Sequence, residues 1–212
     1  MESSEAKVTI VIPAYNAEKY IGRALDSVTN QTFEHWRTVI VDDGSTDKTR
    51  SIISNYSEKD AKITYHLISN RGSAKYPRDF AIYQASTEYV LCLDADDYLD
   101  NDYLQKAWNV KRKTNADVVL SVMHVISEET GNYLYEIPND KFDKTKIYTG
   151  GDLIRLILNK WEIGFNGGMF RKKYLQETLS YPKKNKPIYM NSDEYDSRAI
   201  LCQNPTVAFS DG

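Results

Sequence analysis

The sequence has little cysteine, no long apolar run and no large excess of charge of either sign. Its two cysteines, Cys92 and Cys202, cannot form a disulfide framework, which favours a reducing compartment. The longest segment without Asp, Glu, Lys or Arg, residues 199–210, is too short to span a bilayer. Because there are 27 basic side chains against 30 acidic ones, the chain lacks the positive charge that non-specific nucleic-acid binding requires.

The N-terminal sequence also lacks a targeting signal. The first residues, MESSEAK, have neither the basic nor the apolar region of a signal peptide, so we expect a cytoplasmic protein. Peripheral contact with the inner face of the cytoplasmic membrane is an alternative, because Lys183, Lys184 and Lys186 form a basic loop that suits anionic lipids. A solvated loop is the simpler interpretation of these lysines.

Short apolar runs alternate with amphipathic segments through the first half of the chain. We expect strands at residues 8–13, 37–43, 63–68 and 89–94, and helices at 20–28, 47–56, 78–86 and 101–114. Repeated strand–helix units predict a mainly parallel sheet with helices on both faces, because parallel strands need crossover connections. In such Rossmann-like α/β sheets, ligands bind beyond the carboxyl ends of the strands.

The second half is less regular. It predicts a strand at 117–127, a hairpin or excursion at 128–148, a helix at 149–160, a strand leading into a turn at 163–170, and a helix at 193–203 before a last strand. No low-complexity linker interrupts the chain. We therefore expect a single domain over residues 1–212, built from a half at 1–115 and a half at 116–212.

A polar cluster lies at the end of each of the four strands expected in the first half. The four clusters are Pro13–Asn16, Asp42–Asp47, Asn70–Gly72 and Asp94–Asp97. None of them has the glycine spacing of a P-loop or of a dinucleotide-binding turn. A site without a glycine cradle must bind phosphate in another way.

The carboxylates of the last cluster provide one such way. Asp94 and Asp96 are two residues apart at a strand end, so alternation can point both to the same side. Mg²⁺ commonly binds through one or two carboxylates together with substrate phosphates. The alternative interpretation of this acidic run is a solvated turn or a helix cap.

Taken in order, these segments resemble the family 2 glycosyltransferases, whose catalytic domains have the GT-A fold. The resemblance is carried by VTIVIPAYNAEKYIGRALDSVTNQTF, WRTVIVDDGSTDKT, NRG and YVLCLDADDYLD, and it covers residues 7 to about 115. The later segment SDEYDSR (192–198) looks like the acidic catalytic motif of the family. The resemblance implies transfer of a sugar, with inversion, from a nucleotide diphosphate sugar to the hydroxyl of a glycan or lipid-linked acceptor. UDP is the commonest donor nucleotide of the family, dTDP and GDP sugars stay open as alternatives, and the resemblance implies a role in polysaccharide or cell-surface glycan synthesis.

The resemblance also implies roles for individual residues around the nucleotide. Pro13, Ala14 and Tyr15 would border the base, with Tyr15 close to its ring. Asp43 would hydrogen-bond the base, and Asp42 is the weaker candidate for that role.

The acidic cluster would serve the ribose and the metal. Asp94, with Ala95 beside it, would face the ribose or support the site. Asp96 would be the chief ligand of Mn²⁺ or Mg²⁺, with Asp97 alongside.

Two departures from the family pattern concern the catalytic base and the diphosphate. The family usually has Glu-Asp at the base, whereas this chain has Asp193-Glu194, so we favour Glu194 and keep Asp193 as its rival. The common form N-x-G-x-S-x-A-R-N is here NRGSAKYPRD, one residue longer before Arg78 and with Asp79 in place of Asn. Either Arg78 or Arg71 suits the diphosphate, because a guanidinium matches phosphate oxygens in a bidentate fork.

Other features leave alternatives open. No Q-x-x-R-W motif of processive synthases is present, so either the enzyme adds single sugars or the chain is a truncated domain that stops before the motif. The swapped base residues keep open a catalytically impaired nucleotide-sugar-binding module, and a metal-dependent phosphohydrolase is a third alternative. Trp161 and Phe165 are candidates for contact with the acceptor.

Overall fold

The structure is a computed structural model that describes residues 5–137, 142–157, 166–179 and 192–210, with the backbone alone at 192–194. Its main sheet has eight strands in the order β3-β2-β1-β4-β9-β5-β10-β8. Their bounds are β1 Val8–Ala14, β2 Trp36–Asp42, β3 Ile63–Leu67, β4 Tyr89–Cys92, β5 Val118–Ser121, β8 Tyr148–Thr149, β9 Met169–Arg171 and β10 Thr206–Ser210. The helices are α1 Ile21–Thr29, α2 Thr49–Lys59, α3 Lys75–Gln84, α4 Tyr103–Thr114, α5 Gly150–Ile157, α6 Lys172–Gln176 and α7 Ser192–Cys202.

The predicted α/β class and the mainly parallel sheet are confirmed. β1 pairs in parallel with β2 and β4, β2 with β3, and β5 with β10. Two short strands run the other way: β9 lies antiparallel between β4 and β5, and β8 lies antiparallel at the edge beside β10. The division into halves at residue 115 stays a prediction.

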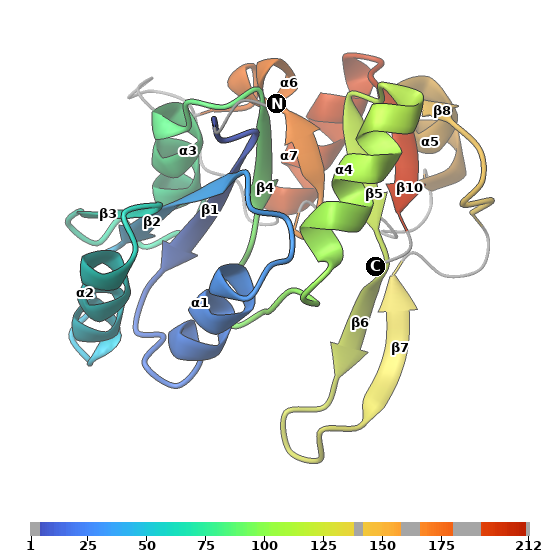
Figure 1. Ribbon diagram of the computed structural model, residues 1–212. Helices are drawn as coiled ribbons and strands as arrows, with labels where there is room; N and C mark the ends of the chain where they lie inside the picture. Colours follow the sequence, from blue (N-terminus) through green and yellow to red (C-terminus); the bar gives the residue numbers. More distant parts are fainter. Residues whose placement is uncertain (1–4, 138–141, 158–165, 180–191, 211–212) are drawn as a thin grey trace.

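Helices cover both faces of the sheet, as the alternation of buried side chains requires (Figure 1). Ile10 and Ile12 of β1 pack in the same cluster as buried residues of α1, α2 and α4. Val11 of β1 points to the opposite face and packs in a cluster with buried residues of α3, α5, α6 and α7. A strand buried on both faces reads as a continuous apolar run, which explains the sequence of β1.

Three expected boundaries are corrected. The strand expected at 117–127 is divided at Val122: β5 stays in the main sheet, while β6 (Met123–Ile126) pairs with β7 (Tyr133–Ile137) in a hairpin that projects from the body (Figure 1). Of the strand and turn expected at 163–170, residues 163–165 lie outside the described residues, and the described part has a turn at Gly167, where φ is +72°, followed by β9. α3 begins three residues earlier than expected, since Pro77 in its first turn breaks no helical hydrogen bond.

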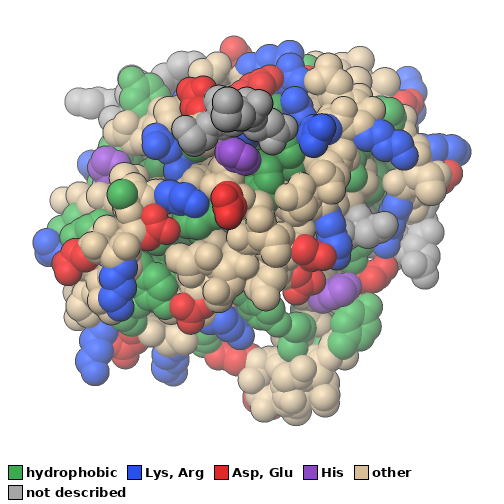
Figure 2. Space-filling view, viewed as in Figure 1, with side chains coloured by type: hydrophobic (Ala, Val, Ile, Leu, Met, Phe, Trp, Pro, Cys, Tyr) green, Lys and Arg blue, Asp and Glu red, His purple; other side chains and the backbone are tan. Residues whose placement is uncertain are grey.

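The surface and the helix lengths complete the picture. Acidic and basic side chains are interspersed over the face viewed in Figure 2. Among the described residues, no helix is both long enough and apolar enough to cross a membrane.

Candidate active site

A cavity of about 460 Å³ opens where β1 and β2 end. Parallel strands present their carboxyl ends at one edge of the sheet, so the loops that follow them meet there. The cavity is lined by Pro13, Ala14, Tyr15, Asp43, Asn70, Gly72, Ser73, Ala74 and Pro77. The structure thus brings together four of the residues predicted from the sequence, and the Tyr15 side chain, 52% exposed, is available to a ligand.

The two adjacent aspartates after β2 have different surroundings. Asp43 lines the cavity although it is only 4% exposed, and both its carboxylate oxygens accept a hydrogen bond from the Arg71 backbone N–H, at 3.0 and 3.1 Å. Burial raises the pKa of Asp43, the hydrogen bond and charge of Arg71 oppose this, and the charge of Asp42 adds to it. Asp42 is fully buried, and its Oδ1 accepts a hydrogen bond from the Ser45 N–H at 2.9 Å.

Hydrogen bonds join the loop after β1 to the loop after β2. The Asn16 N–H donates to Ser45 Oγ and the Thr46 N–H donates to Asn16 Oδ1, both at 2.9 Å. Gly44 has a φ of +75°, and a Cβ there would approach the Asn70 backbone N to 3.0 Å. The hydrogen bonds of Ser45 and Thr46 with Asn16, and the turn at Gly44, therefore fix the loop after β2 against the loop after β1.

The two candidate arginines lie in different places. The Arg71 guanidinium stacks on the ring of Tyr76, 4.8 Å from its centroid, and the residue is exposed. Arg78 is buried in α3, and its Nη2 donates to Asp94 Oδ1 at 3.3 Å. Arg78 therefore joins α3 to the acidic cluster after β4.

The acidic cluster after β4 is held by a residue from the second half of the chain. The Asp94 N–H donates to Asn166 Oδ1 at 3.0 Å, and Asn166 Nδ2 donates to Asp97 Oδ2. Ala95 is buried, whereas Asp96 is exposed and its backbone carbonyl accepts a hydrogen bond from Arg23 Nη2 at 2.7 Å.

The donor set of this loop suits a hard divalent cation. Burial raises the pKa of Asp97, and the charges of Asp94 and Asp96 raise it further, so the three carboxylates repel one another. No three His, Cys, Asp or Glu side chains within the described ranges are grouped closely enough to hold a metal ion. Carboxylate oxygen is the ligand type that Mg²⁺ prefers, and this ion commonly binds through one or two carboxylates together with substrate phosphates.

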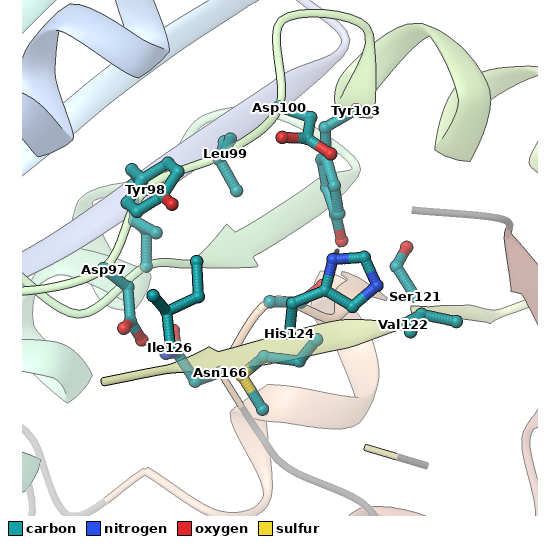
Figure 3. Close-up of a pocket in the computed structure, with 13 residues that line it drawn as sticks. Asp97, Tyr98, Leu99, Asp100, Tyr103, Ser121, Val122, His124, Ile126 and Asn166 are labelled. Carbon is teal, nitrogen blue, oxygen red and sulfur yellow. Dashed lines mark hydrogen bonds between the residues drawn. The ribbon is translucent and has the colours of Figure 1, made fainter. Parts of the chain in front are cut away.

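A second cavity, of about 120 Å³, is lined by residues that include Asp97 of this loop, Tyr103 of α4 and His124 of β6 (Figure 3). Asp97 lies at one end and Ser121 at the opposite end, with His124 between them in the view of Figure 3. Tyr103 reaches across from α4, and its hydroxyl donates to the Gly167 carbonyl. Asp97 thus belongs to the acidic loop and also lines this smaller cavity.

Several predicted residues lie wholly or partly outside the described residues. Asp193 and Glu194 are in the first turn of α7, and their side chains lie outside the described part of the chain. Trp161, Phe165 and the lysines at 183, 184 and 186 lie outside the described residues altogether.

Sequence reasoning missed part of the cavity wall and the residue that holds the acidic loop. Asn70 and Gly72 belong to a cluster noted in the sequence, but Ser73, Ala74 and Pro77 had no motif of their own. Asn166 precedes two glycines, a signal for a turn and not for a contact with Asp94.

Asn166→Ala is expected to weaken binding of a cation at the acidic loop. The change removes the acceptor for the Asp94 N–H and the donor to Asp97, and loss of such supporting partners costs about 10- to 100-fold in metal affinity. Titration of Mn²⁺ in the presence of UDP measures the effect. Asn109→Ala, at an exposed asparagine of α4, is the control, and equal affinities in the two variants would contradict the supporting role.

The sequence model described as "Glycosyl transferase family 2" matches residues 9–179. The chain belongs to this family. The resemblance noted in the sequence is therefore confirmed, and so is the GT-A fold that it implies.

Two curated relatives of this family 2 chain are bacterial glycosyltransferases. GlyA of Streptococcus pneumoniae serotype 4 is 30% identical over 156 residues, which are 74% of this chain and 22% of GlyA. TarS of Staphylococcus aureus strain Mu50, a poly(ribitol-phosphate) beta-N-acetylglucosaminyltransferase, is 37% identical over 119 residues, which are 55% of this chain and 21% of TarS. The matched part is about a fifth of the length of each of these relatives.

Solved structures share the fold. The crystal structure of S. aureus TarS 1–349 in complex with UDP has a TM-score of 0.71 at 25% identity, over 96% of this chain and 60% of that one. The mannosyltransferase PcManGT of Pyrobaculum calidifontis, in complex with GDP-Man and Mn²⁺, has a TM-score of 0.64 at 19% identity, over 98% of this chain and 55% of that one. At that identity the second likeness concerns the fold alone. These comparisons give no support to the alternative of an impaired binding module.

Proposed function

We propose that this chain is the catalytic domain of a metal-dependent inverting glycosyltransferase that transfers a sugar from a UDP-sugar to an acceptor hydroxyl. The observation that carries the proposal is the cavity beyond β1 and β2, with Tyr15 and Asp43 in its wall. An acidic loop follows β4, the strand that pairs with β1 on its other side. An exposed aromatic ring and a buried carboxylate are groups that suit a nucleotide base, and the acidic loop suits a cation bound to the diphosphate.

The residues that would hold the cation are Asp96 and Asp97, with Asp94 supporting them. A bound Mn²⁺ or Mg²⁺ supplies positive charge that stabilises a departing diphosphate. Arg78 Nη2, 3.3 Å from Asp94 Oδ1, adds a fixed positive charge beside the same loop. Ion pairing with Arg78 also orients the Asp94 carboxylate.

Inverting transfer is a direct displacement, so a base is needed on the face of the sugar opposite the leaving group. We assign this role to Glu194, with Asp193 as the rival, in the first turn of α7. The base accepts the proton of the acceptor hydroxyl as that oxygen attacks the anomeric carbon. Ile200 and Leu201 of α7 are buried in the apolar cluster that also holds residues of α3, α5 and α6, and this packing anchors α7 on the sheet.

The acceptor is proposed to be a cell-surface glycan or a lipid-linked one. TarS is named for transfer to poly(ribitol phosphate), an anionic polyol polymer, which makes that polymer the first acceptor to try. A cytoplasmic location, with peripheral contact with the membrane surface, is compatible with such an acceptor.

Transfer itself tests the proposal. UDP-GlcNAc is incubated with poly(ribitol phosphate), Mn²⁺ and the chain, and released UDP and labelled polymer are counted. UDP release with labelled polymer supports the proposal. A folded chain that releases no UDP and labels no polymer with any of several UDP-sugars contradicts it.

Asp43→Asn is expected to lower UDP affinity without lowering thermal stability. A hydrogen bond to a charged group contributes about 1.5–3 kcal/mol, which corresponds to a loss of about tenfold or more in affinity. Because the pKa of Asp43 is raised by burial, its contribution to stability is present below its ordinary pKa and is lost as pH rises through the raised value. At pH 7, burial of the Asp43 carboxylate lowers the free energy of unfolding, and the uncharged side chain of Asn removes that penalty.

Calorimetric titration of UDP and a thermal melt at pH 7 check both parts of this prediction. Asp102→Asn, at an exposed carboxylate paired with Lys106 on α4, is the control and should change neither quantity. Wild-type UDP affinity in Asp43→Asn would remove Asp43 from the nucleotide site. Asp42→Asn tests the rival position.

A further inference from the structure

Three charged side chains are buried together between α3 and α7. Lys75 is 2% exposed, and its Nζ donates to Asp196 Oδ2 at 2.6 Å, to Asp79 Oδ1 at 3.3 Å and to the Thr178 carbonyl at 3.4 Å. Asp79 and Asp196 are buried to the same degree. We refer to Lys75, Asp79 and Asp196 as the buried triad.

The buried triad connects two parts of the candidate active site. Lys75 is the first residue of α3, and the residues on both sides of it, Ser73, Ala74 and Pro77, line the large cavity. Asp196 is on α7, two residues after Glu194 and three after Asp193. One ammonium group therefore joins the wall of the proposed donor site to the helix that carries the proposed base.

The energetics of the buried triad argue against a role in stability alone. Removing one ammonium and two carboxylates from water is costly, and buried ion pairs are often no more stabilising than apolar side chains of the same size. Asp196 Oδ1 is buried and, among the described residues, has no hydrogen-bond partner. Such an arrangement fixes geometry, because an ammonium and its carboxylates keep one relative position where apolar groups allow several.

The sequence around Lys75 points the same way. Lys75 and Asp79 lie in the segment NRGSAKYPRD, which is one residue longer than the common family form and has Asp79 where that form has Asn. The Asp79 carboxylate, which replaces the usual Asn, pairs with Lys75, and the Lys75 ammonium also pairs with Asp196. The departure from the family form thus lies next to an ion pair between α3 and α7.

We propose that Lys75 is a positioning residue that, through Asp196, sets the place of the first turn of α7 relative to the donor cavity. This inference rests on the proposed function, because it assigns the base to that turn. Asp79 holds the Lys75 ammonium from within α3, one turn further along the helix. No member of the triad is among the described residues that line the large cavity, and its charges join α3 to α7, so we expect it to act on the position of the base much more than on binding of UDP.

The test is the triple variant Lys75→Met/Asp79→Asn/Asp196→Asn, which removes the charges together and leaves none of them buried without a partner. We expect kcat for UDP-GlcNAc, measured with poly(ribitol phosphate), to fall about 10- to 100-fold, because small displacements of a catalytic group have effects of that size. UDP affinity and the KM for UDP-GlcNAc should be unchanged. Lys106→Met/Asp102→Asn, which removes an i,i+4 pair at the exposed start of α4, is the matched control and should keep wild-type kcat.

Two results would overturn the proposal: a folded triple variant with wild-type kcat, or a loss of UDP affinity as large as the loss of kcat. If the triple variant does not fold, Asp196→Asn decides in the same assay, because it keeps the Lys75–Asp79 pair and removes only the charge on α7. A fall in kcat supports positioning and an unchanged kcat contradicts it.

Failure of the proposed function itself is recognised separately. If the wild-type chain binds UDP without turning over the donor, amide hydrogen exchange of α7 replaces kcat as the readout. UDP should slow exchange in α7 of the wild-type chain and not in the triple variant, and equal slowing in both overturns the proposal. A wild-type chain that binds no UDP overturns the proposed function and the positioning role that depends on it.

Discussion

Glu194→Gln is expected to lower the rate of sugar transfer by about 100- to 10,000-fold, the usual contribution of a general base. The amide cannot accept the proton of the acceptor hydroxyl, while its size and shape match those of the carboxylate. UDP affinity should be unchanged, because Glu194 lies on α7, whereas the lining of the large cavity comes from the end of β1, the loops after β1, β2 and β3, and the start of α3. A transfer assay and a UDP titration on the same preparation measure both quantities.

Asp193→Asn is the matched control for this prediction. The two residues are adjacent on one helix turn, so the two variants share any general effect on α7. A large loss in Glu194→Gln with a small one in Asp193→Asn assigns the base to Glu194. The reverse pattern assigns it to Asp193, and wild-type transfer in both variants would contradict a base on this turn.

Asp96→Ala is expected to lower transfer by about 100- to 1000-fold, the cost of removing one group that stabilises developing charge. Asp96 is exposed at the tip of the acidic loop, whereas Asp97 accepts a hydrogen bond from Asn166 and Asp94 accepts one from Arg78. Asp96 is therefore the carboxylate most available to a cation brought in with the diphosphate. Dependence of UDP binding on Mn²⁺ should disappear in this variant.

Titrations of UDP with Mn²⁺ and with EDTA measure that dependence. In Asp96→Ala the two affinities should be equal, whereas in the control Asp102→Asn they should differ as they do in the wild-type chain. A variant that keeps Mn²⁺-dependent UDP binding and wild-type transfer would show that Asp96 is not a metal ligand.

The first half of the chain could be predicted from sequence because its signals are local. The apolar runs of β1, β2 and β4 identify buried parallel strands, and the residues that follow each run must then lie at one edge of the sheet. Pro13, Tyr15 and Asp43 accordingly meet in one cavity. The sequence predicts contact of the Arg71 guanidinium with a diphosphate, but it does not indicate the contacts that the structure shows. The Arg71 backbone N–H donates to Asp43, and the guanidinium stacks on Tyr76.

The second half could not be predicted to the same degree, because its arrangement depends on contacts between distant segments. β9 has three residues, too few for a periodic pattern, and it enters the sheet between two strands that precede it in the chain. Asn166 bonds the Asp94 N–H across 72 positions, and Lys75 bonds Asp196 across 121. Nothing in the residues around a lysine or an asparagine indicates such a partner, since it is the packing of α7 and β9 that brings them together.

Calorimetric titration of UDP into the wild-type chain, with Mn²⁺ and then with EDTA, tests the central claim most directly. The claim is that the cavity beyond β1 and β2 and the acidic loop after β4 form one donor site. We predict binding of UDP that is strengthened by Mn²⁺, and weaker binding of GDP under the same conditions. A folded chain that binds no UDP, or binds it equally well in Mn²⁺ and EDTA, would contradict a metal-dependent donor site.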